Sequence, residues 1–361
     1  MQLRIPGPTP CPPEILQVLS KQMINHRGKE FASLIQRVTA RLKDAFQTKN
    51  DVLILTCSGT GGMEAAIVNF LSAGDKVLSA SNGSFGNRFA DIAQRYGADV
   101  KRLTFEWGKA VEPDAVRQAL KSDSKIKAVL ITQNESSTGI TNDVQTLSKI
   151  IKEYDKLLLI DAVSGLGAID LKTDEWNCDV VVTASQKAWM VPPGLAMLSI
   201  SPKAWVANAT AKLPRYYFDL KKAKESLETN ETPFTPAITV FYGLDVALDM
   251  MRQEGLPNVF ARHIRVGKAA RQGIKKLGLT LFADESYASN TVTAVNPPEG
   301  INPDTLRRIL REEYQVILSG GQQTLTGKIF RIGHMGWVNE DDIKVTIEAI
   351  DKALSELGFH G

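Results

Sequence analysis

The chain has 361 residues, of which 43% are hydrophobic and 23% are charged, and its formal net charge is +3. This composition is that of an ordinary globular protein large enough for two domains, and it argues against a nucleic-acid partner or a disordered chain. Pro6 interrupts the start before an apolar leader can form, and no stretch of about eighteen apolar residues follows. We therefore expect a cytoplasmic protein that has no membrane span and takes a small-molecule partner.

From about residue 50 to 200, short β-branched runs alternate with stretches that have helical patterns, which predicts right-handed crossovers and a mostly parallel sheet covered on both faces. The strands are predicted at Val52–Thr56, Lys76–Ala80, Val100–Thr104, Ala128–Thr132, Leu157–Asp161, Val180–Thr183 and Ala196–Ile200. The helices are predicted at Phe31–Phe46, Met63–Leu71, Asn87–Tyr96, Pro113–Lys121 and Val144–Tyr154.

After residue 236 two long helical patterns are followed by shorter elements, which predicts a small α+β domain packed on the larger one. The helical patterns run from Pro236 to Met251 and from Val259 to Leu277. The later elements are predicted at Leu279–Ala283, Thr291–Val295, Asp304–Glu313, Lys328–Ile332 and Glu340–Leu357. Prolines dominate the first twelve residues and predict an extended arm there instead of a regular element. The expected division is an arm over residues 1–15, a large domain over 16–255 and a small domain over 256–361.

A metal site is not expected from the positions of the cysteines and histidines. The three cysteines are far apart and odd in number, which fits a reducing compartment and fits neither a disulfide framework nor a metal cluster. The histidines also lack ligand spacing. These residues are Cys11, Cys57, Cys178, His26, His263, His334 and His360.

Polar side chains follow several predicted strands, at the edge of the sheet where ligands of open α/β proteins bind. After the first strand, the turn from Ser58 to Gly62 lets backbone N–H groups and hydroxyls approach a phosphate at a helix start. A tight glycine connection without a ligand is the alternative for this turn by itself. The turn from Ser58 to Gly62 lacks both the Gly-Lys-Ser/Thr of a P-loop and the third glycine of a dinucleotide fingerprint.

Three further strand ends carry the remaining chemistry. Glu135–Gly139 is rich in hydroxyls, and by itself it is more typical of a Ser/Thr turn than of a binding site. Asp161 ends a strand too apolar for the surface, so its carboxylate either caps backbone or faces a cationic ligand atom. Gln186 and Lys187 end another strand, where a lysine could also extend to solvent. Together these groups at one sheet edge predict a site for pyridoxal phosphate, because that cofactor needs a phosphate-binding turn, a buried anion and an amine. Lys187 would bind its aldehyde, and Asp161 would keep its ring nitrogen protonated.

Across nearly its whole length the chain resembles the class V, fold type I aminotransferases, most closely the alanine-glyoxylate and serine-glyoxylate group. The resemblance is carried by Pro6–Pro10, Ser58–Thr60, Met63–Ala66, Asn82–Arg88, Glu135–Gly139, Asp161–Ser164, Ser185–Ala188, Pro192–Gly194 and Arg331–Gly333. It implies an α/β fold type I transferase with a mostly parallel large sheet and a small C-terminal α+β domain. It also implies that pyridoxal 5'-phosphate forms a Schiff base with a lysine.

The same resemblance assigns roles residue by residue. Lys187 and Asp161 would be catalytic, and Arg331 would bind the substrate carboxylate through its planar fork, in a pocket that Gly7 also lines. Phe85 would stack on the ring where many relatives have tryptophan. The other residues implied for the cofactor are Ser58, Gly59, Thr60, Ser136, Val163 and Gln186, together with Thr235.

Thr235 lies in the segment Glu231–Pro236, which in this family reaches the phosphate of the partner subunit and so implies a homodimer with a shared site. Relatives often supply a tyrosine hydroxyl from this segment, whereas here the aromatic residue is Phe234, and Thr232 is a candidate substitute. For His26 and Arg27 an interface role and a role in the site remain equal alternatives.

The function implied is ping-pong transfer of an amino group from alanine or serine to glyoxylate. Aspartate or ureidoglycine as donor and pyruvate as acceptor remain alternatives within the class. A cysteine desulfurase is disfavoured because no cysteine follows Cys178 to act as the nucleophile of the small domain. A non-catalytic accessory subunit, of the kind sometimes labelled as part of a hydrogenase, is the alternative from another class.

Overall fold

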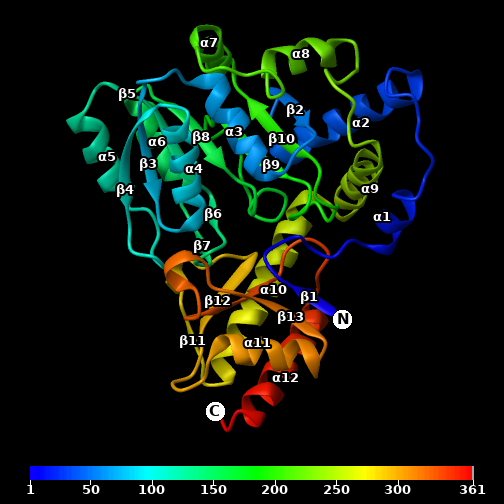
Figure 1. Cartoon of the computed structure of the whole chain (residues 1–361), viewed down its shortest axis with the longest axis vertical. Coiled ribbons are helices and arrows are strands. Elements are labelled where there is room, and N and C mark those ends of the chain that lie inside the picture. Colours follow the sequence, from blue (N-terminus) through cyan, green and yellow to red (C-terminus); the bar gives the residue numbers. More distant parts are fainter. Residues whose placement is uncertain (360–361) are drawn as a thin grey trace.

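A computed structural model describes residues 1–359 and shows a large α/β part joined to a smaller sheet with helices (Figure 1). His360 and Gly361 lie outside the described residues. The large sheet has seven strands in the order β2-β10-β9-β8-β5-β3-β4, and only β10 runs antiparallel to its neighbours. Its strands are β2 (Asp51–Leu55), β3 (Lys76–Ser81), β4 (Asp99–Thr104), β5 (Ile126–Thr132), β8 (Leu157–Asp161), β9 (Val180–Ala184) and β10 (Ala196–Ile200). The mostly parallel sheet expected from the sequence is therefore present.

Helices cover both faces of this sheet because alternate residues of its strands face opposite layers. In β2, Val52 and Ile54 pack into one core, whereas Leu53 and Leu55 pack into the other. The first core is closed by α1 (Pro13–Val18), α2 (Lys29–Phe46), α5 (Pro113–Ser122), α6 (Val144–Glu153) and α9 (Ile238–Glu254). The second is closed by α3 (Gly59–Phe70), α4 (Ser84–Arg95), α7 (Pro202–Thr210) and α8 (Leu220–Glu228). The last two helices were not predicted from the sequence.

The long helix α10 (Leu256–Lys276) runs from the large part to the second sheet (Figure 1). That sheet has the order β1-β13-β14-β12-β11 and packs on α10, α11 and α12. Its elements are β1 (Gln2–Arg4), β11 (Thr280–Leu281), β12 (Val292–Asn296), α11 (Pro303–Glu312), β13 (Val316–Gly320), β14 (Phe330–Gly333) and α12 (Glu340–Glu356). Short segments complete the chain, namely β6 (Asn134–Glu135), β7 (Ile140–Thr141) and the 3-10 turns Glu285–Tyr287 and Gln323–Leu325.

The N-terminal arm is not wholly irregular, so the prediction of an arm without a regular element is wrong. Gln2–Arg4 forms β1, which pairs in parallel with β13, and the backbone N–H of Gln2 donates to the carbonyl of Gln315 at 2.7 Å. Three residues followed by prolines carry no strand pattern of their own; an edge strand forms because β13 offers unpaired backbone groups. The arm is thereby anchored to the C-terminal sheet before it crosses to the large one.

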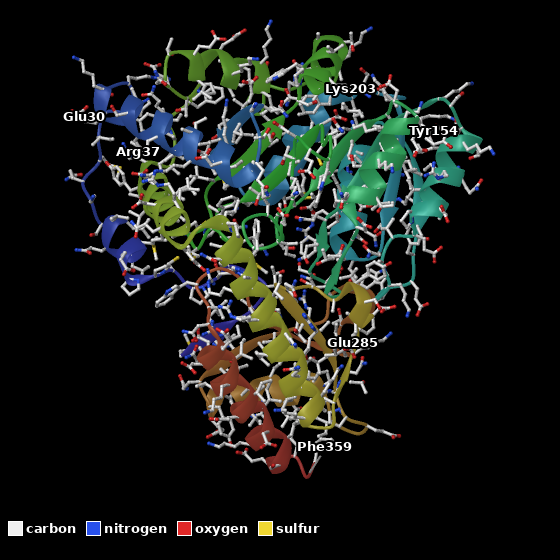
Figure 2. All side chains as sticks on the ribbon, turned by 180° about the vertical axis from the view of Figure 1, so that it is seen from behind. Glu30, Arg37, Tyr154, Lys203, Glu285 and Phe359 are labelled. Atoms are coloured by element: carbon white, nitrogen blue, oxygen red, sulfur yellow. The ribbon has the colours of Figure 1, made fainter. Side chains whose placement is uncertain are left out.

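Figure 2 shows side chains over the whole surface from the opposite side. No helix among residues 1–359 is long and apolar enough to cross a bilayer.

Candidate active site

The predicted site residues meet where the carboxyl ends of the parallel strands of the large sheet face the arm and β14. Asp161 ends β8, and Lys187 follows β9 after a short turn. Asp161 raises the pKa of Lys187 and Lys187 lowers the pKa of Asp161, because the two opposite charges lie near one another. Arg331, although it lies on β14 of the second sheet, also acts on the pKa of Lys187. Residues far apart in the sequence thus converge at one edge.

Lys187 is held by the N-terminal arm. Its Nζ donates to the carbonyl of Pro6, and the carbonyl of Lys187 accepts from the Thr9 hydroxyl at 2.9 Å. A Cβ on Gly7 would lie 2.6 Å from Nζ, so only glycine leaves room for the lysine here. Burial lowers the pKa of Lys187 to about 8, although Asp161 raises it. A larger fraction of this amine is therefore neutral near pH 8 than for a lysine in water.

Asp161 is a buried carboxylate whose charge has little local compensation. Its Oδ1 accepts from the backbone N–H of Val163 at 3.0 Å, and no Lys or Arg of residues 1–359 lies within ion-pair distance. Burial raises the pKa of Asp161 to about 7. Because an unpaired buried carboxylate is costly, the group fits a cationic ligand atom such as a protonated ring nitrogen.

The Ser58–Gly62 run is the first turn of a helix, because α3 starts at Gly59, four residues before the predicted start at Met63. Ser58 occupies the N-cap position, but its hydroxyl makes no capping hydrogen bond and is exposed. The first N–H groups of α3 consequently have no partner within the helix, which is the arrangement that binds anions.

Gly59 and Gln186 are two further residues that the sequence analysis assigned to the phosphate. A Cβ on Gly59 would lie 2.9 Å from Val163 Cγ2, so glycine allows the helix start to pack against the Asp161 loop. The amide oxygen of Gln186 is buried and has no hydrogen-bond partner among residues 1–359. Phosphate oxygens accept hydrogen bonds, so the free N–H groups at the start of α3 are the donors that fit a phosphate group, whereas the unpaired amide oxygen of Gln186 is an acceptor.

Phe85 is fixed by a carboxylate that the sequence analysis did not single out. Glu135 is fully buried, and one of its oxygens accepts from the backbone N–H groups of Phe85 and Gly86, each at 3.0 Å. Its other oxygen accepts from Ser137. A Cβ on Gly83 would lie 2.4 Å from Glu135 Cγ, so the glycine makes room for the carboxylate. The start of α4 and the hydroxyl-rich turn are thereby locked together.

Arg331 joins that turn to the second sheet. Its Nη1 donates to the carbonyl of Ser136 at 2.8 Å and its Nε donates to that of Gly320 at 2.9 Å. Burial lowers the pKa of Arg331 to about 10, whereas Glu135 raises it. No carboxylate of residues 1–359 pairs directly with the guanidinium. It therefore remains able to bind an incoming carboxylate.

The Glu231–Pro236 segment lies apart from this cluster in the single chain. Thr235 is exposed and borders a small hollow at the end of β2, together with Thr56. Thr232 is buried, and its hydroxyl donates to the carbonyl of Phe234 at 2.8 Å. Arg27 anchors the segment through the carbonyl of Thr232 at 2.7 Å and through Glu231. Arg27 thus has a structural contact with this segment.

Sequence reasoning missed Arg88 and Glu135 as members of the cluster, although both belong to motifs that carried the family resemblance. Arg88 lies beside Phe85, with Cζ 4.8 Å from the ring centroid. Nothing local distinguishes either residue from a surface charge, because their roles depend on which loops the fold brings together. The spacing of Phe85 and Arg88 by three residues on a helix was the only available signal.

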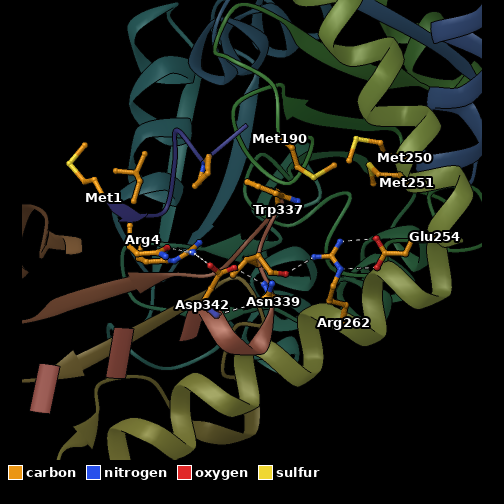
Figure 3. A pocket seen from close by; sticks show the side chains of 14 residues that line it. Met1, Arg4, Met190, Met250, Met251, Glu254, Arg262, Trp337, Asn339 and Asp342 are labelled. Atoms are coloured by element: carbon orange, nitrogen blue, oxygen red, sulfur yellow. Dashed lines mark hydrogen bonds and ion pairs between the residues drawn. The ribbon is translucent and has the colours of Figure 1, made fainter. Parts of the chain in front are cut away.

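A separate cavity of about 710 Å³ lies between β1, α9, α10 and the start of α12 (Figure 3). Its charged residues pair with one another, Arg4 with Asp342 and Arg262 with Glu254. None of the predicted cofactor residues lines it. Across residues 1–359 no group of three or more His, Cys, Asp or Glu side chains is arranged to hold a metal ion.

The fold and the converging lysine, aspartate and helix start define a pyridoxal phosphate enzyme of fold type I. The sequence matches the family described as aminotransferase class V over residues 3–343, and the chain belongs to that family. The protein is therefore a pyridoxal phosphate-dependent aminotransferase, and the fold, family and cofactor expected from the sequence are confirmed.

Individual proteins agree with this assignment and differ in their names. A crystal structure of alanine–glyoxylate aminotransferase from Nostoc sp. superposes with a TM-score of 0.94 at 29% identity, covering 98% of this chain and 95% of that one. L-aspartate–glyoxylate aminotransferase of Paracoccus denitrificans is 37% identical over 98% of this chain and 91% of its own length. A protein named soluble hydrogenase, small subunit, from Synechococcus sp. is 44% identical over 99% of this chain and 94% of its own length.

Proposed function

We propose that the protein moves an amino group from a small amino acid, alanine or serine, to glyoxylate by a ping-pong mechanism. The observation that carries this proposal is the buried guanidinium of Arg331, which has no carboxylate partner among residues 1–359 and acts on the pKa of Lys187. Planar pairing with an α-carboxylate suits arginine. Because donor and acceptor both carry that carboxylate, one guanidinium serves both substrates in turn.

Lys187 and Asp161, near Arg331, have different roles in the proposed reaction. When bound, pyridoxal phosphate supplies an electron sink for the electrons left by removal of the substrate α-proton. Lys187 would hold the cofactor aldehyde through Nζ, and its amine would move the substrate α-proton. Its lowered pKa of about 8 favours the neutral amine that this step requires. Asp161, whose pKa burial raises to about 7, would pair with the ring nitrogen and keep it protonated.

The remaining cofactor residues hold the ring and the phosphate. Ser58, Gly59 and Thr60, at the start of α3, bind phosphate oxygens together with Gln186. Phe85 and Val163 contact the two ring faces, Ser136 lies near the phenolic oxygen, and Gly7 leaves space for substrate. Support comes from the unused N–H donors at the start of α3.

The active enzyme is proposed to be a homodimer in which Thr235 of each subunit reaches the phosphate of the other. Support comes from the exposure of Thr235, since its own chain gives its hydroxyl no hydrogen bond within residues 1–359. Thr232 is a poor replacement for the missing tyrosine hydroxyl because its own hydroxyl is already used. The three free cysteines support a reducing, cytoplasmic location.

The test is to follow each half-reaction separately through the cofactor absorbance. Alanine, serine and aspartate are supplied as donors, and glyoxylate, pyruvate and 2-oxoglutarate as acceptors. Alanine or serine with glyoxylate should be fastest. If aspartate were the fastest donor, the protein would instead be assigned the aspartate–glyoxylate activity in the name of the Paracoccus relative.

The name of the Synechococcus relative favours a second candidate, an accessory subunit without turnover. Borohydride reduction separates the two candidates, since an enzyme should trap its cofactor on Lys187 and also transaminate. A protein that binds the cofactor and turns over no donor and acceptor pair would support the accessory role.

A further inference from the structure

Arg88 occupies an unusual position for an exposed arginine. It lies on the second turn of α4 and reaches back to α3, where its Nη1 donates to the Thr60 hydroxyl at 3.2 Å. Its guanidinium carbon is 4.8 Å from the centroid of the Phe85 ring. A planar cation is thus supported by an aromatic face and directed at the start of a neighbouring helix.

The charge of Arg88 is not neutralised by the chain. No carboxylate of residues 1–359 pairs with it. It adjoins the start of α3, where unsatisfied N–H groups already carry partial positive charge, and a cation is unfavourable at that end of a helix. An anion that binds between the Arg88 guanidinium and the start of α3 would stabilise both positive charges.

The charge of Arg88 also acts on the catalytic groups. Burial raises the pKa of Asp161, and Arg88 opposes that rise. Burial lowers the pKa of Lys187, and Arg331 and Arg88 lower it further. An arginine that extended away from the protein would have no such effect on two groups at the sheet edge.

We infer that Arg88 is a further cofactor-binding residue, which pairs with the phosphate of pyridoxal phosphate opposite the start of α3 and makes the site selective for the phosphorylated cofactor. This inference rests on the cofactor site proposed above. The Phe85 ring holds the guanidinium plane in place, so the same residue that contacts the cofactor ring supports the phosphate contact. Lysine would keep the charge but would lose both the planar fork and the stacking.

A distal carboxylate of a dicarboxylic donor is the other anion that Arg88 could bind. The contact with Thr60 favours the phosphate, because Thr60 belongs to the first turn of α3, where the unused donors gather. Arg331, by contrast, lies on β14 and bonds to Ser136 and Gly320. The two guanidinium groups therefore sit on different elements, one at the phosphate end and one at the proposed carboxylate end.

The test compares the affinity of the apoenzyme for pyridoxal phosphate with its affinity for pyridoxal, both followed by absorbance and by quenching of tryptophan fluorescence. The variant is Arg88→Met, which keeps the length of the side chain and, because Arg88 is exposed, uncovers no core. The matched control is Arg95→Met on the same exposed side of α4. Arg88→Lys is the second variant.

Arg88→Met should weaken pyridoxal phosphate about 10- to 100-fold, the range expected for a lost charge-assisted hydrogen bond, and leave pyridoxal unchanged. Arg88→Lys should fall between Arg88→Met and wild type, and Arg95→Met should match wild type. Equal weakening of both ligands, or of neither, overturns the inference. A loss confined to the aspartate half-reaction, with cofactor affinity unchanged, would overturn it in favour of a substrate carboxylate.

Failure of the proposed function gives a different result. In that case wild type itself would bind pyridoxal phosphate without turning over any donor and acceptor pair. If wild type transaminates normally and Arg88→Met binds both ligands as wild type does, only the role of Arg88 is refuted.

Discussion

Arg331→Lys tests whether a single guanidinium binds the carboxylate of both substrates. The side chain extends from the middle of β14, where the backbone of Arg331 lies opposite Ala294 of β12 and Ser319 of β13. Two backbone carbonyls depend on it, that of the buried Ser136 and that of the partly buried Gly320. A lysine keeps the charge, but one ammonium group cannot reproduce a planar fork that serves two carbonyls and a carboxylate.

The expected cost has a structural part and a functional part. Loss of two hydrogen bonds, each worth about 1 kcal/mol net, should lower the free energy of unfolding by about 2 kcal/mol. Loss of the charge-assisted fork to substrate corresponds to about 1.5–3 kcal/mol, which is roughly a 10- to 150-fold fall in kcat/KM. Because the same fork is proposed for donor and acceptor, both half-reactions should fall together.

Single-turnover absorbance measurements with alanine and then with glyoxylate separate the two half-reactions, and urea unfolding reports the structural cost. Arg308→Lys is the control, because Arg308 lies on the surface of α11 and pairs only with Glu312. A loss in one half-reaction with the other at wild-type rate would refute the shared site. Unchanged rates with glyoxylate would refute the assignment of Arg331 altogether.

Lys187→Ala should abolish transamination while the protein stays folded by circular dichroism, and substantial turnover would rule out its role. Asp161→Ala should lose most activity yet still yield a borohydride-trapped cofactor, and wild-type turnover would show that another group protonates the ring. Asp179→Asn should lower the free energy of unfolding by about 3 kcal/mol, because the half-buried Lys152 loses the charge of its buried partner; an unchanged urea midpoint would contradict this. Burial lowers the pKa of His263 from 6.5 to about 4, so the unfolded state takes the proton first and stability is lost as pH falls from about 6.5 toward 4, by about 2 kcal/mol at pH 5. Comparing the urea midpoints of wild type and His263→Gln at pH 7.5 and 5 tests this, and parallel pH slopes would contradict it.

The sequence by itself determined the elements whose signal is local. All seven strands of the large sheet were predicted within two residues of their ends, because each is a short β-branched run bounded by turn residues. The polar groups at their carboxyl ends, including Asp161 and Lys187, follow from the same pattern. Once the strands are parallel, those ends must share one edge, so the neighbourhood of the site was predictable before the packing was known.

Tertiary structure decided what depends on contacts between distant segments. β1 is a strand only because β13 offers an edge, and β13 itself was not predicted. α3 starts at Gly59 and not at the predicted Met63, because the close packing against Val163 leaves room for a glycine in the first helical turn. The positions of Arg88 and Glu135 also required the fold, since each bonds to the first turn of a helix that is distant in sequence. Local pattern fixes which residues alternate between faces, whereas long-range packing fixes which charges meet and which buried donors remain free for a ligand.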